Sequence, residues 1–300
     1  MRVLHTTVAL ALALLLASCG GSDPEQPARA KAPVRIGTMN FPESQILGEL
    51  YGQALQAKGL RVELQSAVGP REITNRALRK GLLDMYPEYI GVLLSEVHKV
   101  EARPASAAEA YRLAKRLEER RDFTLLDPTK LSNDNALAVK QSFGRKNDVA
   151  GIPDLVRERA VLGAAPEFRT RFEGLIGLER LYGLKFRRFK PVNIGKGLQY
   201  PALDDGKIDV AVVFTTDPQL ARGRYTVLRD PEGVFAVNHV APLISQKVLK
   251  DNGPKLAAAL DAVSALLTTP VMRAMNAKVD IDKRTPREVA DEFLRAQSLK

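Results

Sequence analysis

The chain has 300 residues, of which 45% are hydrophobic and 27% charged, and its formal net charge is +10. So many apolar residues can build sizeable cores, which excludes a disordered chain over most of this length. The basic residues are scattered and Trp is absent, so the charge indicates a solvated basic surface rather than a nucleic-acid-binding protein.

Residues 1–18 have the features of a secretory signal peptide. Arg2 supplies a positive charge, and residues 8–17 form an almost unbroken run of Val, Ala and Leu. That run is too short to span a bilayer but suits the apolar region of an export signal. Small residues then precede Cys19, the single cysteine of the chain, as in a bacterial lipobox. We therefore expect cleavage before Cys19, lipidation of its thiol, and a periplasmic or extracytoplasmic protein anchored to a membrane.

Residues 19–33 are rich in Gly, Pro, Ser and charge, which is typical of a flexible tether. Strands and helices then alternate along the chain. Strands are expected at residues 34–37, 60–64 and 82–86, with helices from Pro42 to about Gly59 and over residues 72–80. This alternation predicts a parallel α/β sheet.

Three further helices carry clear local signals. Ser106 and Glu109 form a capping-box pattern before a charged helix that ends near residue 121. Residues 255–267 are rich in Ala and Leu. Thr285 and Glu288 flank a proline and predict the start of the C-terminal helix.

One sequence pattern occurs twice. Ala-Leu-x-x-Gly-x-x-Asp occupies residues 77–84 and again residues 202–209. In both places a helix is expected to end at the glycine and a strand to begin at the aspartate. The two strands run into polar or aromatic tips at residues 86–89 and 214–217. Two similar α/β halves facing each other across a cleft would explain the repetition.

Signatures of catalysis are mostly missing. His98 and His239, the histidines that follow the signal segment, are far apart in sequence, and there is no nucleophile elbow or phosphate-binding loop. Acid–base chemistry by a carboxylate pair such as Glu88 and Asp217 stays open as an alternative. We expect a binding protein rather than an enzyme, without a metal ion or cofactor.

The strand tips suit a ligand site better. In open α/β sheets, ligands bind at the carboxyl ends of strands, and residues 38–41 lie between the first strand and its helix. N–H groups at that helix N-terminus suit a carboxylate, while Tyr86 and Tyr89 could offer π faces to a cation. The alternatives are core packing for the tyrosines, and turn or capping roles for Asn40 and residues 215–217.

Six short segments carry a family resemblance: residues 36–43, 46–51, 84–91, 135–139, 214–217 and 241–243. From about Val34 to Leu294 the chain resembles the substrate-binding proteins of glycine betaine/choline (osmoprotectant) ABC importers, in the quaternary-ammonium-binding subgroup. The resemblance implies a periplasmic-binding-protein fold, with two α/β lobes joined by two crossover strands around a central ligand cleft. The first lobe would comprise residues 34–137 and 240–300, and the second residues 138–239.

The resemblance also implies a function. The protein would deliver a small quaternary-ammonium or zwitterionic solute to ABC permease subunits in the membrane, and we expect it to be a monomer. Family members hold a trimethylammonium group in an aromatic cage and a carboxylate with polar groups. The alternatives are a solute-sensing lipoprotein of the same fold, or a binder of another small polar solute such as an amino acid.

The strand tips and the resemblance together indicate eleven ligand-binding residues. They are Asn40, Phe41, Tyr86, Tyr89, Asn135, Phe214, Thr215, Thr216, Asp217, Asn238 and His239. The cage departs from the family pattern: Asn135 stands where tyrosine is frequent, Asn238 or His239 replaces another tyrosine, and Met39 stands where lysine is usual. Phe214 keeps an aromatic face. Losing two aromatic faces predicts weaker betaine binding, or a different solute that uses the amides.

Overall fold

The computed structural model describes residues 32–100, 104–194, 197–235 and 238–300, and residues 33–300 form one compact unit. The expected signal peptide, Cys19 and nearly all of the expected tether lie outside the described residues. In the part of the chain that is described, no helix combines the length and apolar character needed to cross a membrane.

The first sheet has five strands in the order β2-β1-β3-β10-β4. They are β1 (Val34–Met39), β2 (Val62–Gly69), β3 (Met85–Tyr89), β4 (Phe123–Leu125) and β10 (Val240–Ser245). β1 is parallel to β2 and β3, whereas β10 is antiparallel to both of its neighbours, β3 and β4. The expected parallel sheet is therefore mixed.

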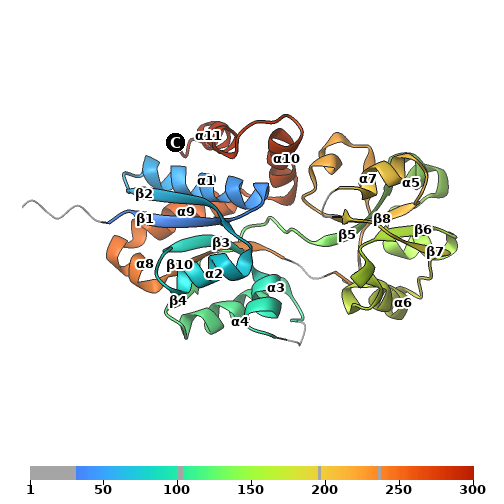
Figure 1. Ribbon diagram of the computed structural model, residues 1–300, viewed down its shortest axis with the longest axis horizontal. Helices are drawn as coiled ribbons and strands as arrows, with labels where there is room; N and C mark the ends of the chain where they lie inside the picture. The colour runs from blue at the N-terminus through green and yellow to red at the C-terminus, as the bar shows by residue number, and fades with distance from the viewer. Residues whose placement is uncertain (1–31, 101–103, 195–196, 236–237) are drawn as a thin grey trace, which may run out of the picture. The chain divides into compact units, whose positions relative to one another are not determined.

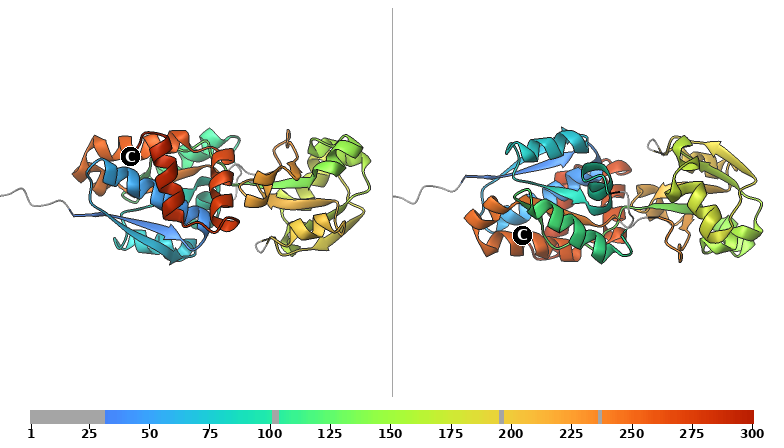
Figure 2. Two further views of the ribbon diagram at one scale, coloured as in Figure 1. Left: turned by 90° about the horizontal axis from the view of Figure 1, so that it is seen from above. Right: turned by 90° about the horizontal axis from the view of Figure 1, so that it is seen from below.

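Helices cover both faces of this sheet (Figures 1 and 2). They are α1 (Pro42–Ala57), α2 (Arg71–Arg79), α3 (Ile90–Val92), η1 (Leu93–Val97), α4 (Ala107–Glu119), α8 (Gln246–Asn252), α9 (Pro254–Leu266), α10 (Thr269–Asp280) and α11 (Pro286–Ala296). One core joins the sheet to α1, α9, α10 and α11, and a second core joins it to α2 and α4. In β3 and β10, residues on alternate sides of the strand enter opposite cores, as the two-residue period of a strand requires.

The second sheet also has five strands, in the order β7-β6-β8-β5-β9. They are β5 (Asn135–Lys140), β6 (Val161–Ala164), β7 (Arg188–Pro191), β8 (Val210–Phe214) and β9 (Tyr225–Val227). Around it lie α5 (Gln141–Asn147), η2 (Ile152–Arg157), η3 (Pro166–Arg169), η4 (Phe172–Ile176), α6 (Gly177–Tyr182), α7 (Gln199–Asp204) and η6 (Pro218–Arg222). Two apolar clusters pack on its opposite faces.

The repeated sequence pattern is a repeated structure. Gly81 and Gly206 both have positive φ, 67° and 66°, which favours glycine at the end of each helix. The Asp84 carboxylate accepts the N–H of Arg35 at 2.8 Å, and the Asp209 carboxylate accepts the N–H of Val161 at 2.8 Å. Each aspartate thus ties the strand it begins to the neighbouring parallel strand. Together with the matching strand orders, this confirms the expected two-lobed α/β fold.

The chain passes from the first sheet to the second between β4 and β5, and returns between β9 and β10. The expected second boundary, before Val240, coincides with the start of β10. The expected first boundary, after Leu137, falls inside β5, because Asn135 already pairs with Phe214 of β8. α10, which was expected in the first lobe, contacts α1 and also η6 beside the second sheet.

Candidate functional site

The loop that follows β1 lies at a switch point of the first sheet. β1 is flanked by β2 and β3, and in such sheets the crevice between diverging connections is the usual ligand position. Asn40 in this loop is exposed and Phe41 is half-buried. The ring centroids of Phe41 and Tyr89 lie 6.0 Å apart at an interplanar angle of 43°. The structure therefore brings Asn40, Phe41 and Tyr89 to one edge of the sheet.

Tyr86 lies on the opposite face of β3 from Tyr89, because residues three positions apart on a strand alternate sides. Its side chain is completely buried. The Tyr86 hydroxyl donates to Glu88 Oε2 at 2.7 Å and accepts from Asn75 Nδ2 at 2.9 Å. The structure does not bring the two tyrosines together in one aromatic cage, and Tyr86 has the surroundings of a core residue.

Tyr89 is 4% exposed and is held at both its ring and its hydroxyl. The Arg71 guanidinium carbon lies 6.0 Å from the ring centroid, and Arg71 is fixed by Glu88 at 3.0 Å. The Tyr89 hydroxyl donates to Glu43 Oε1 at 2.6 Å. Burial and the negative charge of Glu43 hold the pKa of Tyr89 well above its ordinary value, so the phenol stays neutral and acts as a donor.

A buried carboxylate collects donors from three distant segments. Glu43 Oε1 accepts from Tyr89 and also from Asn133 Nδ2 at 3.0 Å. Glu43 Oε2 accepts from Asn276 Nδ2 at 2.7 Å. Glu43 lies in the first turn of α1, where the helix dipole favours a negative charge. We call Glu43, Tyr89, Asn133 and Asn276 the Glu43 cluster.

Sequence reasoning missed the role of Glu43 and both asparagines. Glu43 was expected near the start of a helix and as the last residue of the resemblance segment 36–43, but no role in the site was assigned to it. Asn133 and Asn276 lie 90 and 233 residues further along the chain, so no local pattern connects them with it. Their side-chain types carried no signal, because an isolated asparagine is most often a turn or surface residue.

The edge of the second sheet gathers another group of the expected residues. Asn135, at the start of β5, lies directly opposite Phe214, at the end of β8, and both are half-buried. The Thr215 N–H donates to Asp134 O at 2.9 Å, and the Thr215 hydroxyl donates to Ser132 O at 2.7 Å. Residues 215–217, which we call the 215–217 turn, are thereby fixed to the segment that enters this sheet.

Asp217 closes this turn with its carboxylate. Oδ2 accepts from the Tyr200 hydroxyl at 2.7 Å, from the Phe214 N–H at 3.1 Å and from Gln199 Nε2 at 3.4 Å. Burial raises the pKa of Asp217 to about 6, and the charge of Glu43 adds to the rise, although the three hydrogen bonds oppose it. At neutral pH the turn therefore carries a negative charge next to the backbone of Phe214, at the end of β8.

Asn238 and His239 lie on the segment that returns to β10, and their side chains bind backbone. Asn238 Oδ1 accepts the Val92 N–H at 3.1 Å, and His239 Nδ1 lies 3.0 Å from Leu131 O. The backbone N–H of Asn238 donates to Asp134 Oδ1 at 2.5 Å. The two residues expected in place of a cage tyrosine thus join the two crossing segments.

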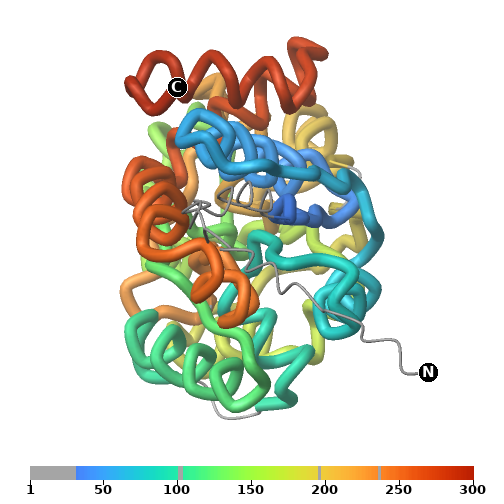
Figure 3. The backbone as a smooth tube through the Cα atoms, turned by 90° about the vertical axis from the view of Figure 1, so that its left-hand side faces the viewer, coloured from blue at the N-terminus to red at the C-terminus, as the bar shows by residue number. Residues whose placement is uncertain are grey.

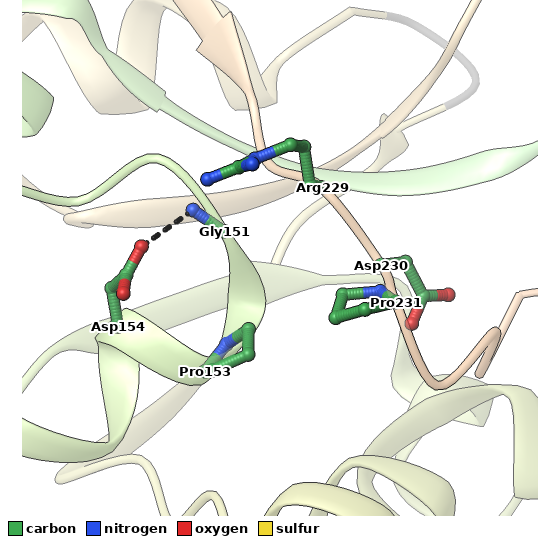
Figure 4. Close-up of a pocket in the computed structure, with 6 residues that line it drawn as sticks. All are labelled: Gly151, Pro153, Asp154, Arg229, Asp230 and Pro231. Atoms are coloured by element: carbon green, nitrogen blue, oxygen red, sulfur yellow. Dashed lines mark hydrogen bonds between the residues drawn. The ribbon is translucent and has the colours of Figure 1, made fainter.

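A separate pocket of about 470 Å³ lies beside the second sheet (Figure 4). Its lining is Gly151, Pro153, Asp154, Arg229, Asp230 and Pro231, and includes none of the expected ligand-binding residues. The Asp154 carboxylate accepts the Gly151 N–H at 2.8 Å, so it serves the local turn. Across the described ranges, no group of three or more His, Cys, Asp or Glu side chains is placed to hold a metal ion.

Comparisons with known proteins place the chain in a family. The model of the substrate-binding domain of ABC-type glycine betaine transport systems matches residues 32–296. The glycine-betaine-binding protein of Pseudomonas aeruginosa is 31% identical, over 95% of this chain and 94% of its own length. The carnitine transport binding protein OpuCC of Listeria monocytogenes is 25% identical, over 97% of this chain and 94% of its own length.

The fold gives the same answer. The solved structure of apo YehZ from Escherichia coli superposes with a TM-score of 0.80 at 26% identity, covering 90% of this chain and all (100%) of its own. The chain belongs to the family of substrate-binding domains of ABC-type glycine betaine transport systems.

Proposed function

We propose that the protein captures a small quaternary-ammonium or zwitterionic solute outside the cytoplasm and delivers it to the permease of an ABC importer. The observation that carries the proposal is the Asp217 carboxylate, which accepts the backbone N–H of the half-buried Phe214 at 3.1 Å, at the carboxyl end of β8. A carboxylate and an aromatic side chain at the same strand end would each attract a methylated ammonium group. Family members are binding proteins of importers rather than enzymes, and they work outside the cytoplasm.

The proposed site uses the expected residues unequally. Phe41 and Phe214 offer partly exposed aromatic faces, each contributing about 0.5–2 kcal/mol to binding of a cation. Asp217 supplies negative charge, while the amides of Asn40 and Asn135 pair with a carboxylate or hydroxyl of the solute. The Tyr89 ring packs against Phe41 and supports it. Thr215 and Thr216 contribute through their backbone groups, which hold the turn in place. We assign Tyr86, Asn238 and His239 supporting roles outside direct contact.

The proposal also includes a lipid anchor at Cys19 and a flexible tether between that anchor and the binding domain. The Cys19 thiol carries lipid, and residues 19–33 link that anchor to the binding domain of a monomer. A flexible tether of about fifteen residues has an r.m.s. reach of roughly 20 Å, which keeps the domain near its permease. The solute-sensing alternative shares this geometry and differs only in its membrane partner.

Calorimetric titration and thermal unfolding of the full-length chain with glycine betaine, choline and carnitine test the proposal. A solute that binds only the folded state stabilises it by about 2.7 kcal/mol at one hundred times its Kd. We expect at least one of the three to do so. The asparagines at cage positions favour amino acids as a second candidate class, so proline and glutamate form the comparison panel. A response to amino acids alone would overturn the quaternary-ammonium assignment.

A further inference from the structure

Two side chains of α10 bind consecutive carbonyl groups of the 215–217 turn. Arg273 donates to Thr215 O from Nε at 3.0 Å and from Nη2 at 2.7 Å. Asn276 donates to Thr216 O at 3.0 Å. Arg273 and Asn276 lie three positions apart and therefore on one side of the helix. The turn that carries Asp217 is held by a helix that follows both sheets in sequence.

The same asparagine also belongs to the Glu43 cluster. Asn276 Nδ2 donates both to Thr216 O and to Glu43 Oε2, and Glu43 Oε1 accepts from the Tyr89 hydroxyl. A continuous line of hydrogen bonds thus runs from the end of β8 to the end of β3. Glu43, Asn276 and Tyr89 are each 4% exposed. Hydrogen bonds buried so deeply are costly to leave unmade, which fixes the geometry of the line.

α10 itself is anchored in the core of the first sheet. Met272 and Met275 are buried in the apolar cluster that includes residues of α1, α9 and α11. Figure 3 shows the C-terminal helices, in red, lying along α1, in blue. The helix therefore has one side in this core and presents Arg273 and Asn276 to the 215–217 turn.

We propose that Asn276, supported by Glu43 and Arg273, is a positioning residue for solute binding. It holds the 215–217 turn, and with it the Asp217 carboxylate and the Phe214 ring, at a set distance from Phe41 and Tyr89. The Thr216 carbonyl and the Asp217 N–H belong to one planar peptide unit, so a shift of that carbonyl moves Asp217 as well. The inference rests on the proposed function, because it concerns the same site.

A purely structural role for Asn276 makes a different prediction from a positioning role. Ser264 provides the matched control, since it is 1% exposed and shares a buried hydrogen bond of 3.0 Å with the Tyr51 hydroxyl, between α1 and α9. Ser264→Ala removes one buried hydrogen bond with no connection to the turn. A structural role lowers the melting temperature in both variants and leaves solute affinity unchanged in both.

The test is calorimetric titration of the full-length chain with choline and with glycine betaine, alongside thermal unfolding. For Asn276→Ala we expect affinity to fall tenfold or more, and for Ser264→Ala to stay within twofold of wild type. Arg273→Gln keeps the experiment decisive should Asn276→Ala fail to fold, with an expected loss of threefold or more. Affinities within twofold of wild type in both α10 variants would overturn the inference and leave the proposed function standing.

Exchanging donor and acceptor between residues 43 and 276 distinguishes the effect of the Asn276–Glu43 hydrogen bond from that of the Asn276–Thr216 hydrogen bond. Asn276→Asp places a second carboxylate against Glu43, and adding Glu43→Gln restores that bond with donor and acceptor exchanged. The Thr216 carbonyl still lacks its donor in the double variant. We expect the double variant to regain thermal stability but to keep the weak affinity of Asn276→Asp; full recovery of affinity contradicts the positioning role. Failure of the wild-type chain to bind any of the three solutes overturns the proposed function and this inference with it.

Discussion

Tyr86 and Tyr89 differ in what surrounds their hydroxyl groups. Tyr86→Phe removes the buried hydroxyl that donates to Glu88 Oε2 and accepts from Asn75 Nδ2, so we predict a loss of about 1–3 kcal/mol in the free energy of unfolding. Solute affinity should stay near that of wild type, because the Tyr86 side chain is buried in the core on the face of β3 opposite to Tyr89. Urea unfolding and calorimetric titration measure the two quantities.

Tyr89→Phe is the companion variant. It keeps the ring against Phe41 but removes the donor to Glu43, so we expect affinity to fall several-fold. Equal losses of affinity in Tyr86→Phe and Tyr89→Phe would contradict the separation of roles along β3.

Asp217 gives solute binding a pH dependence. Its pKa of about 6 in the folded protein lies above the ordinary 3.8, so the folded state takes up a proton more readily than the unfolded one. The carboxyl group's contribution to folding stability therefore declines as the pH rises from about 4 to 6. Binding of a cation has the opposite trend, because the ionised carboxylate attracts it.

We therefore predict that affinity for choline rises between pH 5 and pH 7 and then levels off. Tyr200 and Gln199 act on Asp217 as neutral hydrogen-bond donors. The charged groups that act on it are Glu43 and Arg273. Titrations at pH 5, 6, 7 and 8 measure the slope, and Asp217→Asn should bind more weakly with a flat profile. If the choline affinity of Asp217→Asn depends on pH as strongly as that of wild type, a group other than Asp217 causes the pH dependence.

The residues of the site were predictable only where they follow strand ends. Phe41 and Phe214 could be predicted as ligand-binding residues because ligand loops of α/β sheets follow strands, which a sequence pattern locates well. The pairing of Tyr86 with Tyr89 depended on where β3 ends: the strand was expected to end at Tyr86, but it continues to Tyr89, which places the two side chains on opposite faces. Glu43 and Asn276 meet through tertiary packing alone, and the sequence contains no trace of it.

A buried ion-pair group connects α2, η1 and α4. Glu118 is fully buried and accepts from Arg79 Nη2 at 2.7 and 2.9 Å and lies 2.8 Å from His98 Nε2. Burial alone would raise the pKa of Glu118, but the hydrogen bonds from His98 and Arg79 hold it below its ordinary 4.5. The ionised carboxylate therefore stabilises the fold above that ordinary pKa, and the contribution disappears as the pH falls through the lowered value.

Glu118→Gln should cost about 3–5 kcal/mol of unfolding free energy at pH 7, since it leaves the Arg79 charge without its buried partner. The difference from wild type should narrow below pH 4, where the wild-type carboxylate is also protonated. Urea unfolding at the two pH values provides the measurement. Glu119→Gln, an exposed neighbour on the same helix, is the control and should change stability little. If the difference in unfolding free energy between Glu118→Gln and wild type is the same at both pH values, the charge of Glu118 is not its cause.

Elements with local signals were predicted well, and elements set by long-range pairing were not. The capping box of α11 is present, with Thr285 and Glu288 bonded as expected. β10 has no such local signal, and a proline such as Pro242 is unfavourable in a central strand. In the sheet Pro242 lies opposite Pro87 of β3, so the missing backbone donors fall on one pair of residues. Only the pairing of distant segments makes that arrangement tolerable.

Anchoring is a property of the whole chain. Cys19→Ser removes the thiol that we propose carries lipid, so we predict that the protein moves from the membrane fraction to the soluble fraction. Solute affinity should be unchanged, because the described binding domain begins beyond the tether. Fractionation of cells expressing either form, followed by titration of the purified proteins, measures both effects. A Cys19→Ser protein that still sediments with membranes would require another anchor.

The two-lobed organisation was visible in the sequence because the pattern of residues 77–84 is repeated at residues 202–209. Each copy is short and local, and its glycine and aspartate have fixed structural roles. The strand order was not visible, since it depends on β5 and β10 each inserting between two other strands. The position of α10 between α1 and η6 could not be predicted either, because it depends on packing between segments that are distant in sequence.

The central place of β10 sets an order of folding. The second sheet is made from the continuous stretch between residues 135 and 227, whereas the first sheet lacks the strand between β3 and β4 until residues 240–245 arrive. Contacts over such long separations form slowly. A growing chain can therefore complete its later sheet while the earlier one is still open. The first sheet therefore stays incomplete until most of the chain exists, because its fourth strand in order, β10, comes from residues 240–245.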